Sequence, residues 1–267
     1  LEKDRPKYEK FWQEYGRAIK TGVYSDWQQR EKLQELLLFP SSHSPDKPVT
    51  LAEYVSRMKE NQKFIYYAAG KDRAAVERLP QMELLREKDI EVLYLLDPID
   101  EFAIDALYQY KDKKFQSISR GDLNLDDIAS PQDKQTAENL AKEHEGLLQA
   151  VKEQLNGKIA EVRISQRLKS SPVCLVSGED GITLSMEQIL TELNRTSLKA
   201  RRILELNPNH EIFKVLQRLY KKDSSATAFK DFCELLYGQA LLMEGMLPDD
   251  PAAFAHKVAA LMAEKPA

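Results

Sequence analysis

Cysteine and histidine are scarce in this sequence of 267 residues, which contains two cysteines and four histidines. Cys174 and Cys233 lie far apart and form no Cys-x-x-Cys pair, which argues against a disulfide framework and a zinc knuckle and favours a reducing compartment. The histidines show no metal-ligand spacing. We therefore expect no bound metal.

Glycine is also scarce, and the glycine-rich loops that hold nucleotide phosphates are missing. There are ten glycines, with neither G-x-G-x-x-G nor G-x-x-x-x-G-K-S/T among them. No apolar run reaches the roughly 18 residues of a membrane span, and the opening LEKDRPKY is not a signal peptide. We expect a cytoplasmic protein with no membrane partner. Because the sequence opens without Met inside a helical pattern, we expect a fragment of a longer chain.

An excess of positive charge is missing too. The 39 basic and 43 acidic residues leave a net charge of -4, which gives no reason to expect a nucleic-acid partner. The basic residues that could suggest such a patch lack interleaved aromatic residues, so we predict a solvated or salt-bridged face. They are Arg163, Arg167, Lys169, Arg201 and Arg202.

The first part of the chain indicates helices. The spacing of Phe11, Trp12, Tyr15 and Ile19 predicts a helix that Gly22 ends. A second helix is predicted over 27–39, followed by a loop over 40–50 that is rich in proline and serine. Thr50 and Glu53 then match a capping box at the start of another helix.

Residues 64–118 alternate short apolar runs with amphipathic segments. FIYYAAG, EVLYLL and KFQSIS are predicted strands, with helical stretches between them and an interruption at Pro80. Runs that are apolar on both faces belong in a sheet covered on both sides. We therefore predict a βαβ arrangement in an α/β or α+β fold.

The stretch EVLYLLDPIDEF raises the question of what its carboxylates do. Asp97 suits an N-cap, Pro98 the first helical position, and Asp100 and Glu101 the first turn. The alternative is an acid/base site of an α/β enzyme that uses Asp97, Asp100 and Glu101 with His43 or His210. On the following helix Ile104 and Tyr108 point away from the main apolar face. Phe102 falls at the margin of that face and is a candidate for exposure.

The second half starts with a polar stretch, 124–135, that resembles a boundary between two modules. A single helix is predicted over 137–155, with His144 as a core residue on its stripe. Three strands, IAEVRIS, PVCLVS and RRILELN, and three closing helices, 211–222, 226–246 and 251–264, complete the chain.

The helix over 226–246 carries two apolar faces, roughly 120° apart when counted at 100° per residue. The first face holds Phe229, Phe232, Cys233, Leu236, Ala240, Met243 and Leu247. The second holds Leu235, Leu242 and Met246. One core cannot cover both, so either another helix of the same chain or a second protomer must cover the rest.

The segment GITLSMEQILTELNR carries an apolar stripe that is read in two ways. Its members are Ile182, Leu184, Met186, Ile189, Leu190 and Leu193. Such stripes usually belong to a core. The other reading is an adaptable surface, because a methionine thioether fits irregular partners.

Several long stretches together resemble the ninety-kilodalton heat-shock chaperones, and the bacterial HtpG type most of all. They are YEKFWQEYGRAIKTGVYSD, EKLQELLLFPSS, TLAEYVSRMKENQKFIYYAAG, EVLYLLDPIDEFAIDALYQYKDKKFQSIS and ILELNPNHEIFK, in that order. The resemblance covers almost the whole chain. It weakens over about 122–157 and in PVCLVSGEDGITLSMEQ.

The resemblance implies a chaperone fragment with two parts. Residues 1–126 match the end of the family's middle domain, with a helical segment over 1–45 and a small α-β-α sandwich over 46–126. Residues 127–267 match the carboxyl-terminal dimerisation domain, an α+β unit whose closing helices form a four-helix bundle in the dimer. The ATP-binding domain and the middle-domain arginine that assists hydrolysis precede Leu1 in the family. We therefore expect no enzyme activity and no cofactor here, while ATP and Mg belong to the full-length protein.

The resemblance also implies partners and contact residues. We expect a homodimer, non-native client proteins, and the DnaK-type chaperone system acting through the full-length protein; the ending AEKPA disfavours eukaryotic members. The dimer residues implied are Leu235, Leu242, Met243, Phe254, Val258 and Leu261. The client-binding residues implied are Glu101, Phe102, Met186, Ile189, Leu190 and Leu193. For Phe102, packing at the edge of its helix is the open alternative.

Overall fold

The computed structural model describes residues 1, 3–121, 123, 131–192 and 198–263. The chain divides into two compact units: the first unit is residues 1–77 with 85–118, and the second unit is residues 78–84 with 119–267. Both contain helices and a sheet, so the predicted mixing of α and β structure is confirmed. The predicted boundary between residues 126 and 127 falls outside the described residues and stays a prediction. Among the residues described, no helix has the length and apolarity needed to cross a membrane.

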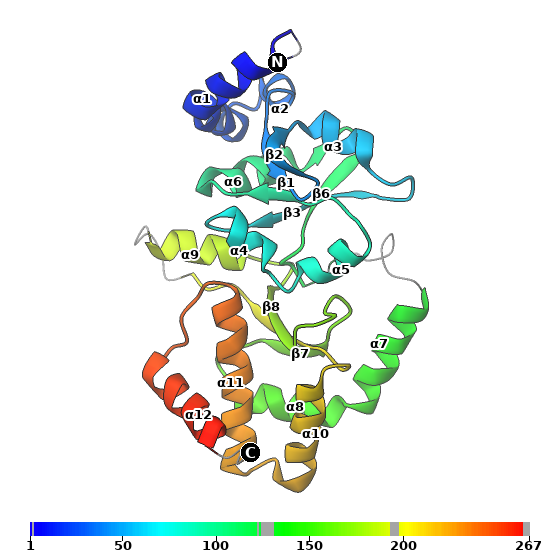
Figure 1. The fold of residues 1–267 in the computed structure, drawn as a ribbon, viewed down its shortest axis with the longest axis vertical. Helices are drawn as coiled ribbons and strands as arrows, with labels where there is room; N and C mark the ends of the chain where they lie inside the picture. Colours follow the sequence, from blue (N-terminus) through cyan, green and yellow to red (C-terminus); the bar gives the residue numbers. More distant parts are fainter. Residues whose placement is uncertain (2, 122, 124–130, 193–197, 264–267) are drawn as a thin grey trace. The chain divides into compact units, whose positions relative to one another are not determined.

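The first unit is built on a six-stranded sheet with the order β2-β1-β4-β3-β6-β5. Figure 1 labels four of its strands, β1, β2, β3 and β6. Its strands are β1 (Phe39–Ser41), β2 (Ser44–Val49), β3 (Phe64–Ala69), β4 (Leu93–Leu95), β5 (Gln109–Tyr110) and β6 (Lys113–Ser117). Strand β3 runs parallel to β4 and to β6, which confirms the βαβ pattern. The other pairs are antiparallel.

Six helices accompany this sheet in the described part of the chain. They are α1 (Arg5–Ser25), α2 (Arg30–Gln34), α3 (Leu51–Arg57), α4 (Arg73–Glu77), α5 (Met82–Glu87), which spans the boundary between the units, and α6 (Pro98–Leu107). Apolar residues of α1, α3 and α6 share one core cluster with the strands. The capping box predicted at Thr50 and Glu53 is confirmed at the start of α3.

The helix predicted over 27–39 is present but shorter than predicted, and the predicted loop over 40–50 is wrong. Helix α2 ends at Gln34, and residues 39–49 form the antiparallel hairpin of β1 and β2. Strand β2 is the outermost strand of this sheet in the part of the chain that the structure describes. An edge strand tolerates Pro45 and Pro48 because the missing N–H groups need not join a ladder.

Two finer helix predictions are also wrong. Helix α1 does not end at Gly22 but runs on to Ser25. A Cβ at Gly22 would lie 3.0 Å from Leu33 Cδ1, so this glycine permits the close approach of a neighbouring side chain. Ile104, predicted to point outward, is buried in the core of the first unit, because α6 packs over more of its circumference than one stripe.

The second unit holds a three-stranded sheet with the order β7-β9-β8, in which β9 pairs parallel to β7 and antiparallel to β8. The strands are β7 (Glu161–Ile164), β8 (Val173–Ser177) and β9 (Arg202–Leu206). The helices are α7 (Pro131–Glu143), α8 (Glu145–Gln154), α9 (Leu184–Glu192), α10 (Glu211–Asp223), α11 (Thr227–Met243) and α12 (Pro251–Ala263). The strand and closing-helix predictions of this half are therefore confirmed.

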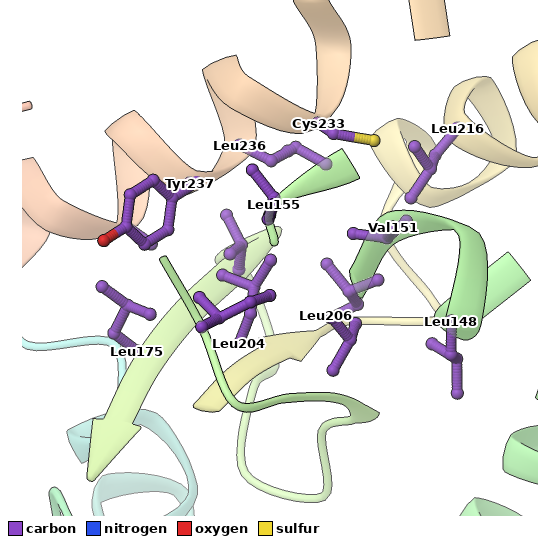
Figure 2. Close-up of a cluster of buried hydrophobic side chains, with 14 of the residues drawn as sticks. Leu148, Val151, Leu155, Leu175, Leu204, Leu206, Leu216, Cys233, Leu236 and Tyr237 are labelled. Atoms are coloured by element: carbon purple, nitrogen blue, oxygen red, sulfur yellow. The ribbon is translucent and has the colours of Figure 1, made fainter. Parts of the chain in front are cut away.

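The core of the second unit lies where α8, α10 and α11 meet the sheet. Figure 2 shows Leu148 and Val151 of α8, Leu204 of β9 and Leu236 of α11 gathered in one apolar cluster. The helix predicted over 137–155 is broken at His144, which precedes α8 as its N-cap residue. The His144 ring meets Phe213 edge-on with 5.3 Å between centroids and lies 3.2 Å from Gln217 Nε2, so it packs at the margin of this core.

Candidate functional site

The carboxylates that follow β4 organise the start of α6. The Asp97 side chain accepts a hydrogen bond from the Ile99 N–H, and Asp100 Oδ2 accepts one from the Asp97 N–H at 3.0 Å, which completes a capping box. Pro98 occupies the first turn, where its missing N–H is not needed. The structural interpretation of EVLYLLDPIDEF is confirmed for these residues.

Asp100 also forms a buried ion pair with α1. Lys20 Nζ lies 2.6 Å from Asp100 Oδ1, with the Trp12 and Phe39 rings near the ammonium group. Burial raises the pKa of Asp100, and the opposing effect of Lys20 is smaller. The histidines of the alternative enzyme site are engaged elsewhere, because His43 lies beside Asp89 and His210 caps α10. The described residues therefore do not bring together the acid/base pair of that alternative.

The two client-binding residues predicted on α6 lie in different environments. Glu101 is buried, whereas Phe102 is partly exposed. The Phe102 ring meets the ring of Tyr24 on α1 edge-on, with 5.7 Å between centroids. Tyr24 was not among the predicted contacts, although its position in the sequence indicates exposure. At 100° per residue, Tyr24 lies about 120° to 140° around the helix from Trp12 and Ile19, and therefore outside the apolar stripe that they form.

Helix α9 is held on the second unit by polar contacts on its inner side. Arg202 Nη2 donates to Glu187 Oε1 at 2.6 Å, and the Ala200 N–H donates to Glu187 Oε2 at 2.8 Å. Of the predicted client contacts, Met186 is buried, Ile189 and Leu190 are partly exposed, and Leu193 lies outside the described residues. The apolar surface that α9 offers in this arrangement therefore comes from Ile189 and Leu190.

Helix α11 buries one apolar face and leaves part of another open. Its inner face comprises Phe229, Cys233, Leu236, Tyr237, Ala240 and Leu241. Leu235 is partly exposed, Leu242 is 45 % exposed and Met243 is 37 % exposed. Met243 and Leu247 were grouped with the face that proves to be the inner one, but both are exposed. Met246, grouped with the second face, is instead partly buried and packs against the core. The predicted grouping is therefore wrong for these three residues, which lie at or beyond the end of α11. The predicted presence of a second apolar face is confirmed.

Helix α12 runs beside α11 and covers it only in part (Figure 1). A Cβ at Gly238 would lie 2.5 Å from the Phe254 ring, so this glycine lets α12 approach closely. Lys257 bridges Asp231, at 2.7 Å, and Glu234. Although α12 is largely apolar, none of its described residues is buried; Phe254 and Val258 are partly exposed and Leu261 is 42 % exposed. Helix α12 therefore covers part of α11, while the apolar residues of α12 itself stay partly or fully exposed.

Part of the basic cluster forms an internal ion-pair network instead of a nucleic-acid surface. Arg163 Nη2 and Arg167 Nε lie 2.8 and 3.0 Å from the carboxylate of Glu205, and both Glu205 and Arg167 are buried. Burial acts to raise the pKa of Glu205, but the two guanidinium groups hold it below its usual range. The salt-bridged interpretation is confirmed for Arg163 and Arg167.

Glu244, at the end of α11, connects three segments of the second unit. Gln81 Nε2 donates to Glu244 Oε1 at 2.5 Å and to the Leu175 carbonyl at 2.6 Å, and Gln188 of α9 donates to the Glu244 carbonyl at 2.8 Å. Enclosure of the carboxyl group raises the pKa of Glu244 from 4.5 to about 7, and the bond from Gln81 opposes this only partly. Sequence reasoning missed this site because its partners are far apart in the chain.

We expect the second unit to lose stability as pH rises from about 5 to 7.5. In this window the folded state holds a proton on Glu244 that the unfolded state has released, so the free energy of unfolding falls with rising pH. The loss should be about 1 to 3 kcal/mol, because one pKa unit corresponds to about 1.4 kcal/mol. The Glu244→Gln variant keeps an acceptor for Gln81 and should remove this slope. Urea unfolding at a series of pH values measures it.

Glu211→Gln provides the matched control for this pH dependence. The bond and charge of Lys214 lower the pKa of the exposed Glu211, so its titration lies below the window. This variant should retain the slope of the unmodified protein. An equal slope in the Glu244→Gln variant would contradict the assignment.

Comparisons with known proteins show what this chain is similar to. The family model described as "Hsp90 protein" matches residues 1–266. The chain is 47% identical over 264 residues to the chaperone protein HtpG of Alkaliphilus oremlandii, covering 98% of this chain and 41% of that protein. It is 43% identical over 264 residues to the chaperone protein HtpG of Bacillus subtilis, with the same coverage of 98% and 41%. The chain thus spans about two fifths of the length of these relatives.

Proposed function

Because this chain belongs to the Hsp90 family, we propose that it is the segment of an HtpG-type chaperone that joins two protomers and contacts non-native client proteins. The observation that carries the proposal is α12, a largely apolar helix with no buried residue among those described. Removal of apolar surface from water stabilises an assembly by about 25 cal/mol per Å². A second copy of the α11–α12 pair would cover the exposed apolar surface of α12 and gain this stabilisation.

The proposed dimer is isologous, which means that the same patch is used by both protomers. Its proposed residues are Leu235, Leu242, Met243, Phe254, Val258 and Leu261. Of these, Leu242, Met243 and Leu261 are exposed, and Leu235, Phe254 and Val258 are partly exposed. Two helices from each protomer would form a four-helix bundle. The contact of Phe254 with Gly238 supports this arrangement, because it fixes α12 on α11 before the partner binds.

The proposed client contacts are the partly exposed residues Phe102, Ile189 and Leu190. Glu101 and Met186 were also predicted to contact clients; because both are buried, such a role would require the surrounding side chains to move. The mixture of aliphatic and aromatic side chains suits partners that expose apolar segments.

ATP enters the proposal only through the complete protein. We assign the ATP-binding domain, its Mg ion and the arginine that assists hydrolysis to the part of the relatives that this chain does not cover. The chain itself should therefore turn over no ATP. Contact with a DnaK-type chaperone system is likewise assigned to the complete protein, and we propose the bacterial cytoplasm as its location.

Two measurements on the 267-residue chain test the proposal. Sedimentation velocity at low micromolar concentration should show a dimer that persists in high salt, because an apolar interface is little affected by screening. The same preparation should slow the aggregation of a heat-denatured protein without added ATP. A monomer that leaves aggregation unchanged would refute the proposal.

A further inference from the structure

A loop of the second unit, residues 169–171, directs its backbone N–H groups at one carboxylate. Glu83 Oε2 accepts from the N–H groups of Lys169, at 2.5 Å, and Ser170, at 2.8 Å. Glu83 Oε1 accepts from the Ser171 N–H at 3.1 Å. The hydroxyl groups of Ser170 and Ser171 also donate to Oε1, at 2.9 and 2.6 Å. Consecutive N–H groups that converge in this way form an anion-binding nest. We call residues 169–171 the nest.

A buried amide from another segment holds the nest in shape. Asn207 follows β9 and is fully buried. Its Nδ2 group donates to the carbonyls of Lys169, at 3.3 Å, and Ser171, at 2.9 Å, and its N–H donates to the Pro172 carbonyl at 2.9 Å. These bonds engage carbonyl groups of the loop and leave the N–H groups for an anion. Because none of them involves Glu83, the nest is preorganised by the second unit itself.

The donors of the nest suit an ionised carboxylate. Partial burial acts to raise the pKa of Glu83, but the hydrogen bonds from Ser171, Lys169 and Ser170 hold it below its usual range. Hydrogen bonds to an ionised group are shorter and stronger than those between neutral groups. A side-chain amide would offer one oxygen instead of two and would turn an NH₂ group toward N–H donors.

Glu83 belongs to residues 78–84, a short segment that we call the strap. The strap is part of the second unit, whereas residues 1–77 and 85–118 on either side of it form the first unit. The chain therefore passes between the units after residues 77, 84 and 118. Gln81 gives the strap a second anchor, because it donates to the Leu175 carbonyl of β8. A released strap would leave only the passage after residue 118.

We propose that the nest is a carboxylate-binding site whose internal ligand, Glu83, anchors the strap on the second unit. This role is independent of client binding and of dimerisation. An external carboxylate meets an occupied site while the strap is bound, because a ligand on the same chain has a high effective concentration.

Glu87 provides the matched control for Glu83. It lies on the same helix, α5, one turn further along, and is exposed. Its carboxylate lies 3.8 Å from Lys88 Nζ. Glu87→Ala therefore removes a carboxylate from α5 and leaves the ligand of the nest in place.

Amide hydrogen exchange of the 267-residue chain tests the site. In Glu83→Ala the amides of Ser170 and Ser171 should exchange at least about tenfold faster, because they lose a charged acceptor. Sodium acetate should slow this exchange at least about threefold relative to sodium chloride of equal ionic strength, because acetate fills the vacated nest. Acetate should leave the unmodified chain unchanged. Glu83→Gln should show the same acceleration to a smaller extent, and Glu87→Ala should stay within about twofold of the unmodified chain.

Limited trypsin digestion tests the strap. Arg78 is exposed and Leu79 is buried, so cleavage between them requires the strap to move. Glu83→Ala should speed cleavage at this bond at least about fivefold, because cleavage follows the population of the released form. Acetate should not slow it, since acetate fills the nest without holding the strap.

Unchanged amide exchange in Glu83→Ala, or acetate that acts no better than chloride, would overturn the carboxylate site. Equal cleavage rates in Glu83→Ala and Glu87→Ala would overturn the anchoring of the strap. Faster cleavage in Glu83→Ala together with acetate-dependent protection of the nest would support both parts of the proposal.

Discussion

Replacing Leu242 with glutamate is expected to convert the proposed dimer into a monomer at low micromolar concentration. Burial of a leucine side chain contributes roughly 1.5 to 3 kcal/mol, and a twofold-symmetric interface loses this contribution twice. The new carboxylates would also have to leave water, which disfavours association further. The dissociation constant should therefore rise at least about a hundredfold, since each factor of ten corresponds to about 1.4 kcal/mol. Sedimentation velocity over a concentration series measures the change.

The monomeric Leu242→Glu variant should remain folded, because Leu242 is already 45 % exposed within its own protomer. Circular dichroism checks that point. Leu198→Glu is the matched control, because it introduces the same group at another exposed leucine of the second unit that lies outside α11 and α12. That variant should remain dimeric. An unchanged dimer in the Leu242→Glu variant would remove this residue from the interface.

Replacing Glu205 with glutamine is expected to destabilise the second unit by about 3 to 5 kcal/mol. The substitution keeps the shape of the side chain but removes the negative charge that lies 3.0 Å from the buried guanidinium of Arg167. Arg167 also donates to the carbonyls of Arg120 and Gly121, and these bonds do not neutralise its charge. Urea unfolding followed by circular dichroism gives the loss. Hydrogen exchange at the amides of β7 and β9 should locate it in the small sheet.

A second substitution separates the charge effect from a packing effect. If the lost charge pair causes the destabilisation, then Arg167→Met in the Glu205→Gln background should recover part of the stability, because an apolar side chain of similar length needs no counterion. If Arg167→Met lowers stability further, the destabilisation comes from packing around Glu205 and not from the lost charge pair.

Local signals were sufficient for most of the secondary structure. The capping boxes at Thr50 and at Asp97 involve residues three apart, so both could be read directly from the sequence. The apolar runs of β3, β4 and β8 have few alternatives to a covered sheet.

The errors in the predicted secondary structure occur where contacts with neighbouring segments override the local preference. The hairpin of β1 and β2 contains prolines that an edge position tolerates. Gly22 lies inside α1, where the lack of a Cβ leaves room for Leu33.

For the candidate sites too, features within one helix could be predicted from the sequence, whereas features that depend on distant segments could not. The two apolar faces of α11 followed from counting residues around one helix, and the exposure of Leu242 agrees with the count. The burial of Glu101 and Met186 could not be read in this way, because the groups that cover them come from other parts of the chain. The same holds for Glu244, whose carboxyl partner Gln81 is 163 residues away in the sequence.

The sequence by itself determined the family of this protein, the mixed α and β character of its fold, and the presence of more apolar helix surface than one face can bury. These properties depend on residues close together in the chain or on long stretches shared with relatives. Only the tertiary structure decided that Tyr24 meets Phe102, that Arg167 is neutralised by Glu205, and that α12 covers α11 while remaining open itself. Each depends on which distant segments come into contact, and spacing along the chain carries no information about such contacts.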